Sequence, residues 1–114
     1  MSLRTYLDQI KQQGALTYIQ KPVSKVLQAS GILKALEPEP IHFDSISEAR
    51  FPVMGNLLCS KASFAGYLGI PVQQIIPILT RAIASSRPPQ VVENAPCQEV
   101  IIKNPDLDDL PILL

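Results

Sequence analysis

The sequence contains few of the residues that mark specialised classes of protein. In 114 residues it has no tryptophan, one histidine, two cysteines and five glycines. Two cysteines allow at most one disulfide, and a lone histidine cannot form a metal site without other ligands. Ten basic and ten acidic residues give a formal net charge of zero, which argues against a basic nucleic-acid-binding surface. No apolar run approaches the roughly 18 residues of a transmembrane helix, and the N-terminus lacks the core of a signal peptide, so we expect a cytoplasmic protein.

Aliphatic residues and proline are what the sequence has in quantity. Hydrophobic residues make up 46% of the chain, and there are eleven prolines, about twice the usual share of ~5%. A disordered proline-rich linker lacks the hydrophobic residues that a core requires. The composition therefore indicates a folded domain that is divided into short elements, and the length allows one hydrophobic core but not two.

The spacing of apolar residues, helix caps and prolines predicts four helices and several short strands. In chain order we expect a helix after Ser2 that stops at Gly14, a strand at 15–20, a helix from Ser24, strands from 41 and at 51–58, a helix capped by Ser60 or Ser63, a helix at 72–86, and strands at 91–92 and 98–103. Pro77 interrupts the last helix, so we expect a kink or a regular helix that begins near Ile76. The predicted fold class is α+β, as a small single domain.

The most reactive side chains lack the partners that would build a site. Cys59 and Cys97 match no short metal-ligand spacing and have no histidine nearby to activate a thiol. We interpret them as reduced, mostly buried thiols, with a reactive thiol or a disulfide as the alternatives. His42 lies in a predicted strand without a cysteine or carboxylate at ligand spacing. We interpret it as an ordinary, partly exposed imidazole, with a role at an interface as the alternative.

The acidic residues and glycines also form no complete site. Asp106, Asp108 and Asp109 lack the loop pattern of a calcium site, so we favour a solvated turn over a site for a hard cation. The glycines are scattered and form no phosphate-binding loop, and Gly66 and Gly69 indicate a helix end rather than a ligand contact. We therefore predict no catalytic, cofactor-binding or metal-binding residue in this chain.

Six motifs occur in an order that is similar to one enzyme family. They are the helix, glycine and strand of 2–23 with Pro-Val at its end, Pro-Val-Met-Gly-Asn-Leu at 52–57, Tyr-Leu-Gly-Ile at 67–70, Arg-Pro-Pro at 87–89, Ala-Pro-Cys-Gln-Glu-Val at 95–100 and Leu-Pro-Ile at 110–112. Together they resemble the N-terminal region of the UbiD family, the decarboxylases that use prenylated FMN. The fold that this resemblance implies is the N-terminal α+β lobe of such enzymes.

The resemblance implies a structural role within a larger enzyme. The chain would be the N-terminal domain or a fragment of a UbiD-like carboxy-lyase for aromatic or α,β-unsaturated carboxylic acids, as in 3-polyprenyl-4-hydroxybenzoate decarboxylation in ubiquinone biosynthesis. Residues 1–106 would form the domain, and 107–114 would begin the connection to a flavin-binding barrel. The family's catalytic arginine and glutamates, and its Mn, K and flavin phosphate contacts, have no counterpart here. Prenylated FMN, Mn and K are therefore expected for the full-length enzyme, and this chain alone is predicted to be inactive.

The expected partner is the remainder of the decarboxylase or a larger catalytic subunit, and formation of a homo-oligomer stays open. An alternative is a stand-alone accessory protein or small subunit that docks through its apolar C-terminus. A third interpretation is an unrelated α+β binding module. That module would be favoured if the helix after Ser2 did not pack against the strand at 15–20.

Overall fold

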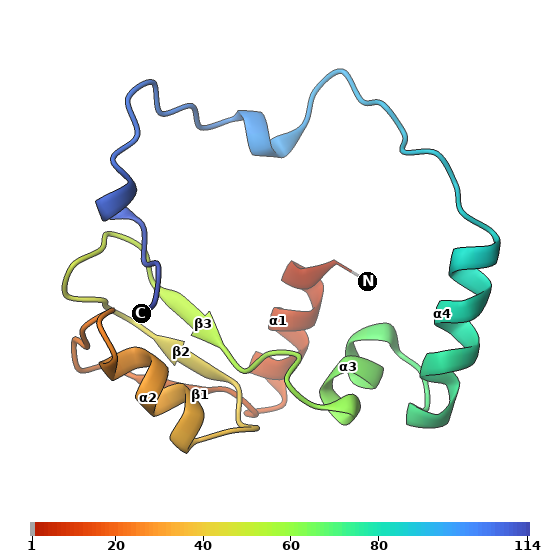
Figure 1. Ribbon diagram of the computed structural model, residues 1–114, viewed down its shortest axis with the longest axis horizontal. Coiled ribbons are helices and arrows are strands. Elements are labelled where there is room, and N and C mark those ends of the chain that lie inside the picture. The colour runs from red at the N-terminus through yellow and green to blue at the C-terminus, as the bar shows by residue number, and fades with distance from the viewer. Residues whose placement is uncertain (1) are drawn as a thin grey trace.

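The computed structural model describes residues 2–114, and within them the chain forms four α-helices and three short strands (Figure 1). In chain order these are α1 (Leu3–Gln12), β1 (Thr17–Ile19), α2 (Gln28–Ala35), β2 (Ile41–Phe43), β3 (Val53–Gly55), α3 (Lys61–Leu68) and α4 (Ile75–Ala84). Three single 3₁₀ turns accompany them, η1 (Val72–Gln74), η2 (Pro96–Gln98) and η3 (Leu107–Asp109). The predicted α+β class is confirmed.

The strands form one small sheet in the order β1-β2-β3. β1 runs parallel to β2 with Thr17 opposite Ile41, and β3 runs antiparallel to β2 with Gly55 opposite Ile41. Parallel neighbours require a crossover connection, and α2 lies in that connection. A Cβ atom at Gly55 would overlap the Leu33 side chain of α2. Glycine at this position therefore lets the helix lie directly against the sheet.

Two apolar clusters stabilise the sheet and the helices beside it. The larger cluster surrounds Phe43 and Ile41 of β2, which are fully buried, and joins them to Ala29 of α2. The smaller cluster joins Tyr6 and Ile10 of α1 to residue 16, just before β1. Helix α1 therefore packs against the start of β1, so the condition that favoured an unrelated binding module is not met.

Local signals explain where α3 and α4 begin and end. The Ser60 hydroxyl accepts from the Ser63 N–H at 3.0 Å, and the Ser63 hydroxyl accepts from the Ser60 N–H at 3.1 Å, which forms a capping box. Gly69 ends α3 with a φ of 68°, a left-handed conformation that glycine adopts without steric cost. Pro77 is the third residue of α4. The N–H that proline lacks has no intrahelical partner at that position, so a regular helix forms around it.

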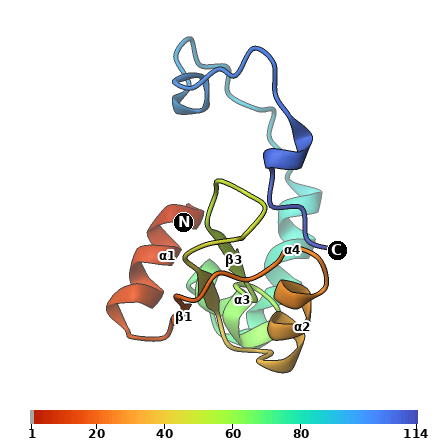
Figure 2. The ribbon, with the colours of Figure 1, turned by 90° about the vertical axis from the view of Figure 1, so that its left-hand side faces the viewer.

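Residues 85–106, here called the extended segment, follow α4 and span the open side of the molecule (Figure 1). Figure 2 shows the segment standing away from the sheet. Its only regular element is the turn η2, so the predictions of strands at 91–92 and 98–103 are wrong. The physical reason is that a strand forms by hydrogen bonding to a neighbouring strand, and the described residues offer neither stretch such a neighbour.

This path makes the molecule much larger than a compact chain. The radius of gyration is 17.1 Å, against roughly 13 Å for a compact domain of about this length. The accessible surface is 8832 Å², about 2,600 Å² more than the roughly 6,200 Å² expected for a folded monomer of this mass. Among residues 2–114, all the buried residues lie from Tyr6 to Ile75. The second half of α4 and the residues after it therefore contribute no buried residue.

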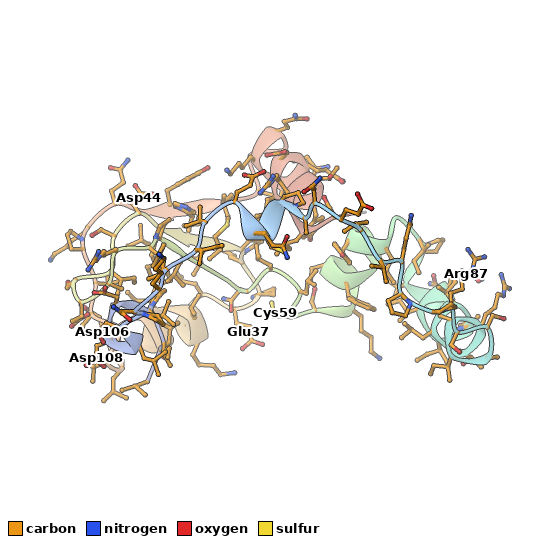
Figure 3. All side chains as sticks on the ribbon, turned by 90° about the horizontal axis from the view of Figure 1, so that it is seen from above. Glu37, Asp44, Cys59, Arg87, Asp106 and Asp108 are labelled. Atoms are coloured by element: carbon orange, nitrogen blue, oxygen red, sulfur yellow. The ribbon has the colours of Figure 1, made fainter. Side chains whose placement is uncertain are left out.

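The C-terminal residues return to the neighbourhood of α2. The Leu114 N–H donates to the Lys25 carbonyl at 3.0 Å, and the Leu114 carbonyl accepts from the Leu27 N–H at 2.8 Å. Leu113 packs against the larger core cluster. The extended segment is thus fixed at both ends, to α4 on one side and to the neighbourhood of α2 on the other. Figure 3 shows Arg87 and Asp106 at opposite ends of the molecule.

Candidate functional site

Helix α4 and the turn before it carry an uncovered apolar stripe. Val72, Ile76, Leu79 and Ile83, here called the α4 stripe, follow one another at spacings of four, three and four residues, which places them on one side of the helix. Ile76 and Ile83 are 72% and 81% exposed. A helix with one apolar face normally buries that face against another element. The α4 stripe therefore indicates a surface that is made to be covered by protein.

A groove of about 540 Å³ lies between α3 and the start of α4. Leu58, Phe64 and Val72 contribute apolar walls, and Cys59 lines it together with Lys61. The Cys59 thiol donates to the carbonyl of residue 56 at 3.2 Å, so it is bound to the backbone rather than to a general base. The groove can therefore receive an apolar side chain, but its geometry shows no nucleophile–base pair.

Both cysteines are free and exposed, so the prediction of mostly buried thiols is wrong. Cys59 lies at the rim of the groove (Figure 3), and Cys97 lies on η2 within the extended segment. The prediction assumed that each thiol had enough protein around it for burial. Neither place is covered by residues 2–114, so the thiols face solvent.

His42 lies on β2 and pairs with the carboxylate of Asp44. The His42 Nδ1 and Asp44 Oδ1 atoms are 2.8 Å apart, and the ring of Tyr18 on β1 lies 5.3 Å from the imidazole. The His42 side chain is 20% exposed, which confirms the interpretation as a partly exposed imidazole. Residues two apart in an extended chain share a face, so the pattern His-x-Asp was the sequence signal for this pair.

The acidic turn near the C-terminus fixes the end of the extended segment. The Asp106 carboxylate accepts from the Asp108 N–H at 2.9 Å, and Asp109 forms an ion pair with Arg50 at 2.7 Å. The Lys25 ammonium donates to the Asp108 carbonyl at 2.8 Å. The three aspartates thus belong to an exposed turn, as predicted. The Asp106 carboxylate caps the turn, the Asp109 carboxylate binds Arg50, and Asp108 contributes its backbone. Sequence reasoning missed both basic partners, because they lie more than 50 residues away and no local pattern identifies them.

A second tie holds the connection between β1 and α2. The Ser24 hydroxyl donates to Glu48 Oε1 at 2.5 Å, and the Lys25 N–H donates to Glu48 Oε2 at 2.9 Å. These two bonds, the hydroxyl bond first, stabilise the charged carboxylate and hold the pKa of Glu48 below its ordinary value. Ser24 therefore caps a turn before the helix, and α2 begins only at Gln28.

The described residues contain neither a cluster of metal ligands nor a glycine-rich phosphate loop. Between residues 2 and 114 no group of three or more His, Cys, Asp or Glu side chains could hold a metal ion. The glycines stand apart in the sequence, whereas a phosphate loop needs them clustered so that backbone N–H groups can reach the anion. We therefore derive no catalytic step from this chain.

Within residues 2–114 no single helix is long and apolar enough to cross a membrane. Helix α3 and residues 72–84 together have the length and apolar composition of a membrane span, but a bend of 80° separates them.

The arrangement as a whole defines a class of protein. An uncovered helix stripe, an open apolar groove and an unpaired extended segment occur together on one small α+β unit. Large uncovered apolar surfaces mark sites where further protein packs. These features are typical of a domain against which further protein packs.

Comparison with known proteins identifies the family. Residues 7–86 match the family described as the 3-octaprenyl-4-hydroxybenzoate carboxy-lyase N-terminal domain, UbiD_N. The chain therefore belongs to the UbiD family and corresponds to its N-terminal domain. This confirms the resemblance that the six sequence motifs indicated.

Three known proteins show the extent of the similarity. The chain is 34% identical over 113 residues to the anhydromevalonate phosphate decarboxylase of Methanosarcina mazei. The alignment covers 99% of this chain and 26% of that protein. It is 28% identical, with a TM-score of 0.89, to an evolved dimeric form of the UbiD-class enzyme HmfF from Pelotomaculum thermopropionicum in complex with prenylated FMN. The HmfF structure in complex with FMN gives the same identity and TM-score. The alignments cover 99% and 100% of this chain but 28% and 27% of the two HmfF chains, so the chain spans about a quarter of the length of its relatives.

Proposed function

We propose that this chain is the structural N-terminal domain of a cytoplasmic decarboxylase for aromatic or α,β-unsaturated carboxylic acids, and that it contributes scaffold rather than catalytic groups. In the complete enzyme prenylated FMN would supply the electron sink for loss of CO₂. The residues that hold this cofactor would come from the remaining three quarters of the polypeptide. Family membership supports the reaction type, and the named HmfF complex supports the cofactor class.

The observation that carries the scaffold role is the uncovered α4 stripe. Two of its four residues, Ile76 and Ile83, are 72% and 81% exposed, and the other two are 40% and 39% exposed. The chain also exposes about 2,600 Å² more than expected for its mass, whereas one partner in a standard interface buries roughly 800 Å². A surface of this size matches a domain–domain contact within a large enzyme better than contact with a small ligand.

The α+β domain would therefore position its neighbour without taking part in the chemistry. Its sheet and two core clusters give a rigid base, and α4 and the extended segment reach from this base around the neighbouring domain. The ties at Arg50 and Lys25 hold the far end of the segment in place. In this role the domain keeps the neighbour's apolar surface away from water, which stabilises the assembled enzyme.

A fusion protein tests this proposal. Residues 1–114 are joined to the part of the Methanosarcina decarboxylase that follows the segment aligned with this chain. With prenylated FMN, we expect the fusion to release CO₂ from the substrate of that enzyme, and we expect the isolated chain and the isolated remainder to release little or none. Turnover by the isolated chain would contradict the scaffold role. A folded, flavin-loaded fusion without turnover would contradict the domain assignment.

A separate accessory subunit is the second candidate, and the exposed C-terminal side chains favour it. Ile112 and Leu114 are 56% and 65% exposed and offer an apolar edge to a partner chain. In that case the chain and the remainder, expressed as separate polypeptides, would co-purify and regain activity together. A strictly monomeric chain that leaves the remainder unbound and inactive would contradict this candidate and leave the covalent domain.

A further inference from the structure

We infer that residues 100–103 form a β-strand by pairing with a sheet in the remaining part of the UbiD-type enzyme. This inference rests on the proposed function and assigns a specific contact to the extended segment. The stretch reads Val100, Ile101, Ile102 and Lys103 and lies between the turns η2 and η3.

The backbone of this stretch is the first line of evidence. No hydrogen bond joins the N–H or C=O groups of Val100, Ile101, Ile102 or Lys103 to any residue between 2 and 114. The turns on both sides are hydrogen-bonded. In η2 the Glu99 N–H donates to the carbonyl of residue 96 at 3.2 Å, and in η3 the N–H of residue 109 donates to the carbonyl of residue 106 at 3.2 Å. The backbone of residues 86–94 makes no hydrogen bond within residues 2–114 either. The stretch 100–103 differs in lying between two bonded turns, and it has the length of a short strand.

The side chains are the second line of evidence. Val100, Ile101 and Ile102 are 78%, 77% and 61% exposed. Successive side chains of a strand point to opposite faces, so Val100 and Ile102 would lie on one face and Ile101 on the other. A strand that is apolar on both faces is typical of a sheet covered on both sides. Three consecutive β-branched residues in contact with water are unfavourable, and pairing inside such a sheet removes all three from water.

The structural comparisons indicate what supplies the partner strand. The TM-score of 0.89 extends over 99% of this chain, so the match includes the extended segment and its open path. The proteins that share this path are UbiD-class enzymes of which the chain covers only 27% or 28%. A path that makes few contacts within the chain is thus shared with much longer enzymes. We therefore assign the partner strand of residues 100–103 to the additional part of the enzyme rather than to a second copy of this chain.

Amide hydrogen exchange on the fusion protein tests the inference. In the isolated chain we expect the amides of residues 100–103 to exchange as fast as those of an unstructured peptide. In the fusion we expect at least two of these amides to exchange more slowly by about 100-fold or more, because each is bonded to a sheet. Three proline substitutions complete the test, one as a control and two within the proposed strand. Gln90→Pro lies in the same exposed segment outside the strand, whereas Ile101→Pro and Ile102→Pro each remove one N–H, and at least one of these two should abolish the protection.

The outcomes separate this inference from the proposed function. An active fusion in which residues 100–103 exchange at the rate of the isolated chain overturns the strand and leaves the domain role intact. In the isolated chain, slower amide exchange of residues 100–103 at higher protein concentration would mean that the strand pairs with a second copy of the chain. That result also overturns the inference. If the fusion does not fold, the same measurement on the intact Methanosarcina enzyme, at the residues aligned with 100–103, decides. Fast exchange there overturns the inference.

Discussion

Replacing the two most exposed isoleucines of the α4 stripe tests whether that stripe is an interface. The double variant Ile76→Gln/Ile83→Gln keeps a good helix former at both positions and removes the branched apolar groups. Arg81→Gln is the matched control, because residue 81 lies on the opposite side of the same helix. In the isolated chain each change should alter the free energy of unfolding by no more than about 0.5 kcal/mol, as is usual for exposed positions.

The expected effect on association follows from the exposed fractions. Complete burial of an isoleucine side chain is worth roughly 1.5–3 kcal/mol. Ile76 and Ile83 keep 72% and 81% of their surface in water, so most of this energy is still available for a partner. The double variant should therefore lose about 2–4 kcal/mol of binding energy, which corresponds to a roughly 30- to 1,000-fold weaker affinity.

Isothermal titration calorimetry of the chain against the separately expressed remainder of the Methanosarcina enzyme measures this loss. The wild-type chain and the Arg81→Gln variant should bind alike, and the double variant should bind more weakly by the stated factor. Urea unfolding of each isolated chain, followed by circular dichroism, verifies that the helix is intact. Equal affinities for the double variant and the control would refute the reasoning, since the stripe would then face solvent in the assembled enzyme as well.

Three further predictions concern the α+β domain. Phe43→Ala should lower the free energy of unfolding of the isolated chain, measured in urea, by about 3–5 kcal/mol, because Phe43 is fully buried. The control Phe51→Ala, at a side chain that is 46% exposed, should cost under about 1 kcal/mol. Equal losses would contradict the assigned core. Gly55→Ala should cost about 1–3 kcal/mol in the same assay through overpacking against α2, and an unchanged midpoint would show that the helix does not press on the sheet there. Ser24→Ala should raise the pKa of Glu48 toward its ordinary value, measured by carboxyl-carbon NMR titration.

The last of these predictions sets a direction for the effect of pH. The pKa of Glu48 is lowered in the folded chain, so its carboxylate stabilises the fold above the pKa of an unfolded glutamate. This contribution falls away as the pH drops through the lowered folded pKa. Ser24→Ala should therefore weaken the acid dependence of stability. A Glu48 pKa that does not respond to the substitution would show that the hydroxyl bond is absent in solution.

The sequence was informative wherever neighbouring residues determine the structure. Ser60 and Gly69 marked both ends of α3, because a cap and a left-handed glycine act on the adjacent backbone. The position of Pro77 was consistent with a helix that begins just before it. These features depend on a few consecutive residues, and no distant contact overrides them.

The sequence was uninformative wherever the structure depends on what lies opposite. Residues 98–103 have the composition of a strand, yet a strand exists only when another strand pairs with it. Cys59 has the character of a buried thiol, but its exposure is decided by whether the groove beside it is filled. The pairing of Arg50 with Asp109 joins residues far apart in the chain. Each of these depends on tertiary packing, which no pattern of neighbouring residues encodes.

The confinement of the core to residues 6–75 also has a consequence for synthesis on the ribosome. Every buried residue of the two core clusters, and the whole sheet, is made early, and only Leu113 joins the larger cluster late. The α+β domain can therefore begin to fold while the polypeptide is still growing. In a protein as long as the Methanosarcina relative, of which this chain covers 26%, roughly 320 further residues take about 15–65 s to translate. During that time the α4 stripe is exposed to the cell, and chaperone binding to nascent chains should be concentrated there.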